Sequence, residues 1–144
     1  MLISPCLMFS GKAEQAMRFY VSVFNESAIL ELIRYGHEEE KDRDKISRGV
    51  IRIHNQTILC FDSVVEHNFS FTPSTSLVIE CGTLSELNNV HDALAVNGEV
   101  LMSLDTYQRH QHMVWYNDQF GVSWQLVYFG EQRLYNNENY VIIS

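Results

Sequence analysis

Two histidines in the second half of the chain have the spacing of metal ligands. His110 and His112 are two residues apart, so on a strand both imidazoles would lie on the same face. Together with Asp118 they could form a site of two histidines and one carboxylate for a divalent metal. Solvated or hydrogen-bonded histidines at a strand end are the alternative, and they need no metal. We favour this alternative, so no metal cofactor is predicted.

Cys60 is a candidate nucleophile or soft metal ligand. A thiolate forms where a cationic neighbour lowers the pKa of the thiol, and no Lys or Arg adjoins Cys60 in the sequence, although Arg52 on a neighbouring predicted strand could approach it. A buried, inert thiol is the favoured alternative. The three cysteines form no CxxC pair, which predicts reduced thiols and a cytoplasmic location.

Composition and missing motifs exclude several classes of function. The formal net charge of −8 and the scattered Lys and Arg residues argue against a nucleic-acid partner. The sequence has neither a long apolar stretch for a membrane helix nor a signal-peptide pattern at its start. It also lacks HExxH, GxSxG, SxxK and a glycine-rich phosphate loop. We therefore expect a cytoplasmic protein that binds neither nucleic acid nor membranes.

The hydrophobic pattern of the first half predicts a strand, a helix and three further strands. The expected segments are 2–9, 12–24, 28–35, 49–54 and 57–62. The charged segment 36–45 is expected to be a solvated loop, with a mobile lid over a site as the alternative. The first half therefore predicts the order β-α-β-β-β.

The second half repeats this order. Gly82 aligns with Gly11 at an offset of 71 (82 minus 11), and the helical apolar positions follow at the same offset. After a shorter loop the offset becomes 65, which aligns Gln125 with Cys60 (125 minus 60). The sequence thus predicts an α+β fold of two similar modules.

Several runs of residues resemble one known family. They are PCLMFSGKAEQAMRFYVSVF from Pro5 to Phe24, RYG from Arg34, LVIEC from Leu77 and DQFGVSWQLV from Asp118. These runs resemble PhnB-like proteins, often labelled 3-demethylubiquinone-9 3-methyltransferase, of the glyoxalase/bleomycin resistance/dioxygenase group in the vicinal-oxygen-chelate superfamily. The resemblance implies two βαβββ modules that form a cup-shaped mixed sheet with helices outside. It implies one domain over 1–129, with modules at about 1–66 and 72–129, and a C-terminal extension at 130–144.

The resemblance also implies where a ligand would lie. Superfamily enzymes carry metal ligands on the first and last strands of each module, which places the corresponding positions at Pro5 and Gln125, and the internal offsets add Ser76 and Cys60. These four residues are poor ligands for a catalytic metal. The expected lining of the cup consists of Pro5, Leu7, Phe9, Cys60, Ser76, Trp115 and Gln125.

We therefore predict a homodimer that binds a small molecule in the cup without a catalytic metal. One alternative is an enzyme that acts on a small molecule, either a metal-dependent lyase, isomerase or dioxygenase with a displaced metal site or a thiol-dependent enzyme that uses Cys60. The other is a structural dimer with a filled cup. Methyl transfer is not predicted, because the sequence has no βαβ unit with a glycine-rich turn for S-adenosylmethionine. A phosphonate ligand would have only Arg34 and Arg52 as cations on the predicted strands.

Overall fold

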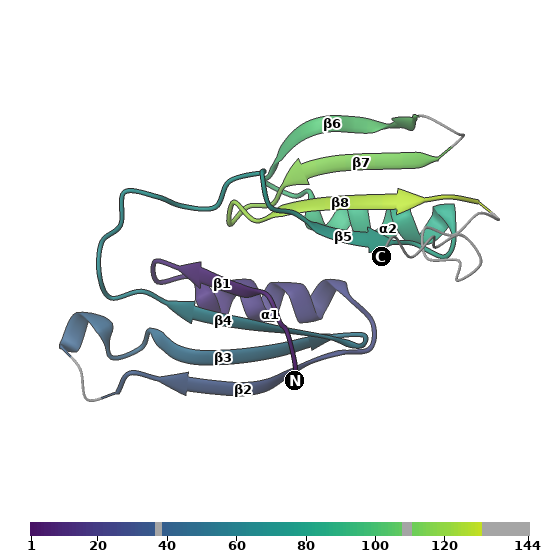
Figure 1. Ribbon diagram of the computed structural model, residues 1–144. Coiled ribbons are helices and arrows are strands. Elements are labelled where there is room, and N and C mark those ends of the chain that lie inside the picture. Colours follow the sequence, from purple (N-terminus) through teal and green to yellow (C-terminus); the bar gives the residue numbers. More distant parts are fainter. Residues whose placement is uncertain (37–38, 108–110, 131–144) are drawn as a thin grey trace, which may run out of the picture. The chain divides into compact units, whose positions relative to one another are not determined.

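The computed structural model describes residues 1–36, 39–107 and 111–130, and the chain divides into two compact units, Met1–Ser70 and Phe71–Ser144. Each unit contains a strand, a helix and three further strands in that order (Figure 1). This confirms the predicted α+β class and the repeated βαβββ order. The predicted C-terminal extension at 130–144 lies outside the described residues except for Gly130.

The first unit is a four-stranded mixed sheet with the strand order β1-β4-β3-β2. Its elements are β1 (Cys6–Phe9), α1 (Ala13–Val23), β2 (Ser27–Arg34), the short 3-10 helix η1 (Glu40–Asp42), β3 (Ile46–Ile53) and β4 (Gln56–Asp62). Strand β1 runs parallel to β4, and the other neighbours are antiparallel. Strand β3 begins three residues before the predicted start at 49, so Arg48 lies within the sheet.

The second unit has the same topology, with the strand order β5-β8-β7-β6. Its elements are β5 (Leu77–Glu80), α2 (Leu84–Leu94), β6 (Glu99–Thr106), β7 (His112–Asn117) and β8 (Ser123–Tyr128). Strand β5 runs parallel to β8, as β1 does to β4. In the described part of the chain, no helix has the length and apolar character needed to cross a membrane.

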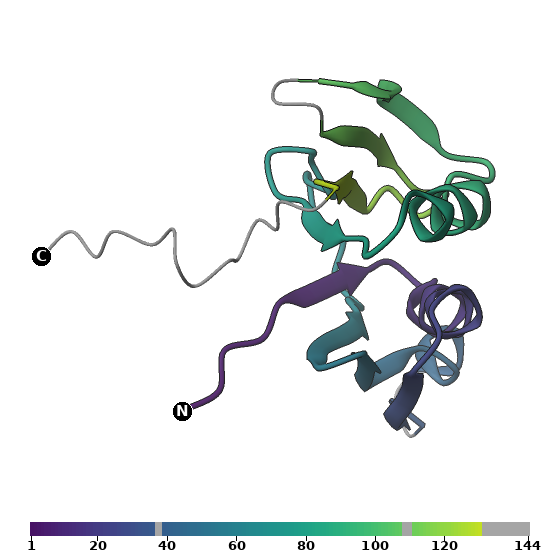
Figure 2. The ribbon, with the colours of Figure 1, turned by 90° about the vertical axis from the view of Figure 1, so that its right-hand side faces the viewer.

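One helix covers one face of each sheet, and we call the opposite face the open face (Figure 2). The apolar side chains of α1 that face its sheet are fully buried, and so are Leu87 and Leu94 of α2. Gly49 of β3 lies directly under α1, where an added Cβ would be 2.6 Å from Sδ of Met17. Gly49 therefore marks which face of the first sheet is in contact with the helix.

The two helices begin in different ways. The backbone N–H groups of Gly11 and Ala13, at the start of α1, donate to Oδ1 of the buried Asp62 at 2.7 and 3.0 Å. Helix α2 instead has Thr83 as its N-cap, whose Oγ1 accepts a hydrogen bond from the N–H of Glu86 at 3.0 Å. In the first unit, the carboxylate of Asp62 at the end of β4 therefore accepts the hydrogen bonds at the start of α1. In the second unit, Thr83 has this role for α2.

The charged segment before β3 differs from the predicted solvated loop. Residues 37 and 38 lie outside the described residues, but the following residues form η1, and Asp42 is only 5% exposed. Its carboxylate pairs with Nζ of Lys45 at 2.7 Å. The other described residues of the segment are exposed or partly exposed, as a solvated loop would be. Asp42 is the exception among them, and an ion pair with a neighbour three residues on compensates its burial.

Candidate functional site

The strand pairing assigns each candidate residue to one face of its sheet. Cys60 pairs with Gly49, and Leu7 pairs with Cys60, so both side chains lie on the face covered by α1. Phe9 pairs with Asp62, whose carboxylate binds the start of α1, and Pro5 precedes β1. The placement of Leu7, Phe9 and Cys60 in a ligand-lining surface is therefore corrected: they pack against the helix, and Pro5 lies outside the strand.

The cause of this error is a shift of one residue between the two modules. Val78 pairs with Gln125 on the open face of the second sheet, whereas in the first sheet Cys6 pairs with Leu59 on the open face. The strands therefore correspond at offsets of 72 (78 minus 6) and 66 (125 minus 59), although the helices correspond at 71. Because side chains alternate between the faces of a strand, an error of one residue transfers every assignment to the wrong face.

Three of the predicted residues do lie together on the open face of the second sheet. Trp115 pairs with Gln125, and Nε1 of Trp115 donates to Oγ of Ser123 at 2.8 Å. Oγ of Ser123 is also 2.8 Å from Oγ of Ser76. The structure thus brings Ser76, Trp115 and Gln125 onto one surface, and a hydrogen-bonded chain joins the first two through Ser123.

The alternative metal site does not form as a unit. His112 begins β7 and pairs with Tyr128, whereas Asp118 follows the other end of the same six-residue strand, about 20 Å away at 3.3 Å per residue. His110 lies outside the described residues. Among residues 1–36, 39–107 and 111–130, no group of three His, Cys, Asp or Glu side chains could hold a metal ion.

Asp118 instead organises the turn between β7 and β8. Its Oδ1 accepts hydrogen bonds from the backbone N–H groups of Phe120 and Val122 at 2.8 and 3.1 Å. Its Oδ2 accepts a hydrogen bond from Nε1 of Trp124 at 2.8 Å. Trp124 is buried on the helix-covered face, as its alternation with Gln125 predicts. The carboxylate of Asp118 therefore has a structural role.

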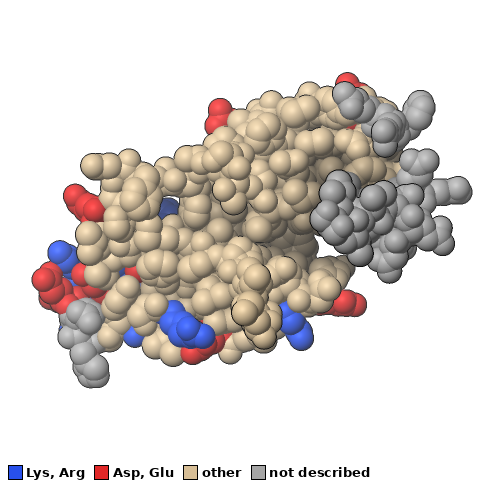
Figure 3. Space-filling view, viewed as in Figure 1, with Lys and Arg blue, Asp and Glu red and all other residues tan. Residues whose placement is uncertain are grey.

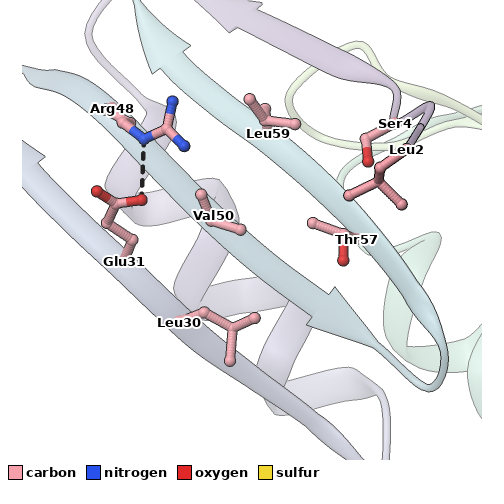
Figure 4. Close-up of a pocket in the computed structure, with 8 residues that line it drawn as sticks. All are labelled: Leu2, Ser4, Leu30, Glu31, Arg48, Val50, Thr57 and Leu59. Atoms are coloured by element: carbon pink, nitrogen blue, oxygen red, sulfur yellow. Dashed lines mark hydrogen bonds and ion pairs between the residues drawn. The ribbon is translucent and has the colours of Figure 1, made fainter.

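The first unit contains a pocket of about 590 Å³ on the open face of its sheet (Figure 4). Its lining comes from the N-terminal segment and from strands β2, β3 and β4. These residues are Leu2, Ser4, Leu30, Glu31, Arg48, Val50, Thr57 and Leu59. Most of this lining is apolar, and Oγ of Ser4 is shielded from solvent without a hydrogen-bond partner among the described residues.

The charged residues of this pocket form an ion pair. Nε of Arg48 donates to Oε2 of Glu31 at 2.9 Å, and both side chains are partly exposed. Basic and acidic side chains are intermingled over β2, β3 and η1 in the space-filling view (Figure 3). Arg34, one of the two cations on the predicted strands that a phosphonate could have used, pairs with Glu14 of α1 at 2.6 Å.

Cys60 does not have the surroundings of a reactive thiol. Its side chain is 1% exposed, and burial raises the pKa of the thiol to about 12, with smaller contributions from Cys6 and Asp62. A thiolate therefore does not form at neutral pH. The favoured prediction of an inert, buried thiol agrees with this environment.

The pocket residues Ser4, Glu31 and Arg48 were missed in the sequence analysis. Arg48 lay outside the predicted strand 49–54, and the one-residue error in the offset placed the first-strand ligand position at Pro5. Ser4 corresponds to Ser76 at an offset of 72 (76 minus 4), which only the strand pairing shows. Nothing in the sequence identifies Glu31 as the partner of Arg48, since 17 residues separate them.

The fold defines the class of protein. A structure described as a glyoxalase/bleomycin resistance protein/dioxygenase from Alicyclobacillus acidocaldarius superposes with a TM-score of 0.61 at 11% identity, and covers 94% of this chain and 96% of its own. The protein thus has the fold of the vicinal-oxygen-chelate superfamily. Within it, the chain belongs to the PhnB-like family, whose model is described as 3-demethylubiquinone-9 3-methyltransferase and matches residues 1–127.

Two solved structures are also similar to this chain. A Bacillus cereus structure described as a PhnB protein with the same methyltransferase label is 40% identical, has a TM-score of 0.83, and covers 89% of this chain and 99% of its own. Protein PA1353 from Pseudomonas aeruginosa is 21% identical with a TM-score of 0.77, and covers 89% and 97%. No curated protein matches the chain. These comparisons confirm the resemblance seen in the sequence.

Proposed function

We propose that the protein binds a small organic molecule in the pocket on the open face of the first sheet. The observation that carries the proposal is the pocket itself: its volume of about 590 Å³ lies within the range of small-molecule sites, about 300–1,000 Å³. Such sites combine mostly apolar walls with a few polar groups that orient the ligand. Leu30, Val50 and Leu59 supply the walls here, and Thr57 and Arg48 supply polar groups.

Binding is proposed in place of thiol or methyl-transfer chemistry. The buried thiol of Cys60 faces the helix rather than the pocket, so it cannot reach a ligand there. In both described units, β1 and β5 have short connections into helices but no GxGxxG turn that would hold a nucleotide-like cofactor. The methyltransferase description of the family is therefore not part of the proposal.

A pocket-filling substitution tests this proposal. The neutral probe N-phenyl-1-naphthylamine should bind saturably to the wild type, with a rise in its fluorescence. Leu59→Trp places an indole in the pocket and should weaken this binding at least about tenfold, a loss of about 1.4 kcal/mol. The matched control is Gln15→Trp, which adds the same side chain on the exposed side of α1. Equal probe binding by both variants, or none by the wild type, would refute the proposal.

We also propose a cytoplasmic homodimer. Two-fold dimers are the commonest soluble oligomers, and the apolar residues Met1, Leu2 and Ile3 are all at least 80% exposed in the single chain. The three cysteines are free thiols, which suits a reducing compartment. Sedimentation velocity at micromolar concentration should show a dimer, and a monomer would exclude this part of the proposal.

A further inference from the structure

We propose that the pocket of the first unit selects small apolar monocarboxylates, with the guanidinium of Arg48 as the anchor for the carboxylate. This inference rests on the proposed function, because it names the ligand class of the same pocket. It is drawn from the hydrogen bonds of Arg48, from the charges on the open face and from the distribution of cations between the two units.

Arg48 has unused hydrogen-bond donors in the pocket. A guanidinium carries five N–H donors in a planar fork, and Arg48 uses only Nε, toward Glu31 at 2.9 Å. In the described part of the chain, its two terminal nitrogens make no hydrogen bond. In Figure 4 they extend away from Glu31. Two parallel N–H groups of an arginine match the two oxygens of a carboxylate.

The charge on this face suits one negative charge on the ligand. The charged side chains on the open face of the described sheet are Arg48, Arg52 and Glu31, which sum to +1. The whole chain has a net charge of −8, so this face differs in sign from the protein as a whole. A monoanion would neutralise the face. A dianion would leave an uncompensated charge beside Glu31, which is unfavourable in a partly buried site.

The remaining lining suits an apolar body. Leu2, Leu30, Val50 and Leu59 contribute the aliphatic surface around Arg48. Burial of an apolar group against such side chains contributes about 25 cal/mol per Å². The pocket therefore combines one cationic anchor with an apolar wall.

The distribution of cations favours the first unit as the anion site. Among the described residues of the second unit there is neither Lys nor Arg, although its sheet strands carry Glu80, Glu99 and Asp105. Among the described residues, the open face of the second sheet, where Trp115 and Gln125 lie, therefore carries neither a lysine nor an arginine. Among residues 1–36, 39–107 and 111–130, arginines on an open face therefore occur in the first sheet, where Arg48 lines the pocket.

A matched pair of ligands tests the inference. 3-Phenylpropanoate and 3-phenylpropanamide have the same apolar body and differ in charge, and each can be titrated as a competitor of N-phenyl-1-naphthylamine at pH 7 and low salt. The wild type should bind the carboxylate about tenfold more tightly or better, as expected for hydrogen bonds to a charged group. Arg48→Gln should abolish this preference and leave the affinity for the amide nearly unchanged.

Two further variants complete the test. Glu31→Gln removes the competing carboxylate and should strengthen binding of 3-phenylpropanoate several-fold, whereas Arg18→Gln removes a cation on the exposed side of α1 and should change nothing. Equal affinity for the two ligands, an unchanged preference in Arg48→Gln, or tighter binding of 3-phenylpropylamine would overturn this inference alone. Absence of binding by the probe itself would instead overturn the proposed function.

Discussion

Replacement of Asp118 by Asn separates a structural role of this carboxylate from a role in metal binding. The side chain is 4% exposed, and its oxygens accept hydrogen bonds from the backbone N–H groups of Phe120 and Val122 and from the indole of Trp124. In Asp118→Asn the amide oxygen can keep the two backbone bonds, but the amide nitrogen then faces the N–H of Trp124 at 2.8 Å. Two donors face each other, and both are buried.

The expected loss of stability follows from these contacts. A hydrogen bond to a charged group contributes about 1.5–3 kcal/mol, and a buried donor left unsatisfied costs about 1–3 kcal/mol. Part of the two effects overlaps, so we expect Asp118→Asn to lower the free energy of unfolding by about 2–4 kcal/mol. For a slope of about 2 kcal/mol per molar urea, the midpoint of unfolding falls by about 1–2 M.

A double-mutant cycle assigns the effect to the contact with the indole. Trp124→Phe removes the N–H group, so Asp118→Asn should cost about 1–2 kcal/mol less in that background than in the wild type. Urea unfolding followed by far-ultraviolet circular dichroism measures all four proteins. An unchanged midpoint in Asp118→Asn, together with loss of a stoichiometric divalent metal from the purified protein, would refute the structural role and restore Asp118 as a metal ligand.

Four other predictions concern the buried thiol of Cys60, the contact of Gly49 with α1 and the N-cap of α2. Cys6, which is exposed, should react with iodoacetamide at pH 8 before Cys60 does. With a pKa of about 12, only about one Cys60 thiol in ten thousand is ionised at that pH. Mass spectrometry that shows Cys60 labelled first would contradict this prediction. Stability should also fall between about pH 9 and 12, since the ordinary thiol pKa of 9.0 applies to the unfolded chain, which then loses its proton before the folded chain does. Gly49→Ala should lower the free energy of unfolding by about 1–3 kcal/mol, because its Cβ would lie 2.9 Å from the carbonyl oxygen of Cys60, and an unchanged urea midpoint would exclude this contact. Thr83→Ala should lower the free energy of unfolding by about 1 kcal/mol through loss of the N-cap hydrogen bond. The control is Lys12→Ala, because Lys12 is the N-cap residue of α1 and makes no side-chain hydrogen bond there. An equal loss of stability in both variants would show that the cap is not the cause.

The order of the elements and the family could be predicted from the sequence because both depend on local patterns. Apolar residues at helical spacing and short apolar runs between glycines predict one helix and four strands in each half. Most boundaries agree with the structure to within three residues, and the sequence motifs near Gly11 and Trp124 indicate the family. Trp124 and Gln125 were also assigned to opposite faces of β8, since alternation along one strand is itself local.

The faces of the remaining strands were decided by tertiary contacts. The helices of the two modules correspond at an offset of 71, but the strands correspond at 72 and 66, and one residue is enough to exchange the two faces. Leu7, Phe9 and Cys60 therefore pack against α1, and the pocket is lined by neighbours such as Leu59. No pattern along the chain reports such a shift, because the pairing of β1 with β4 joins residues about 53 positions apart.

The candidate ligand site shows the same limit. The sequence contains Arg48, Glu31 and Ser4, but their roles depend on β3 starting at Ile46 and on pairing between β2 and β3. Glu31 pairs with Val50 after a bulge in β2, which brings its carboxylate to the guanidinium of Arg48. The sequence alone determined the composition, the modules and the family of this protein. Only the tertiary structure decided which side chains meet, because contacts between strands depend on register.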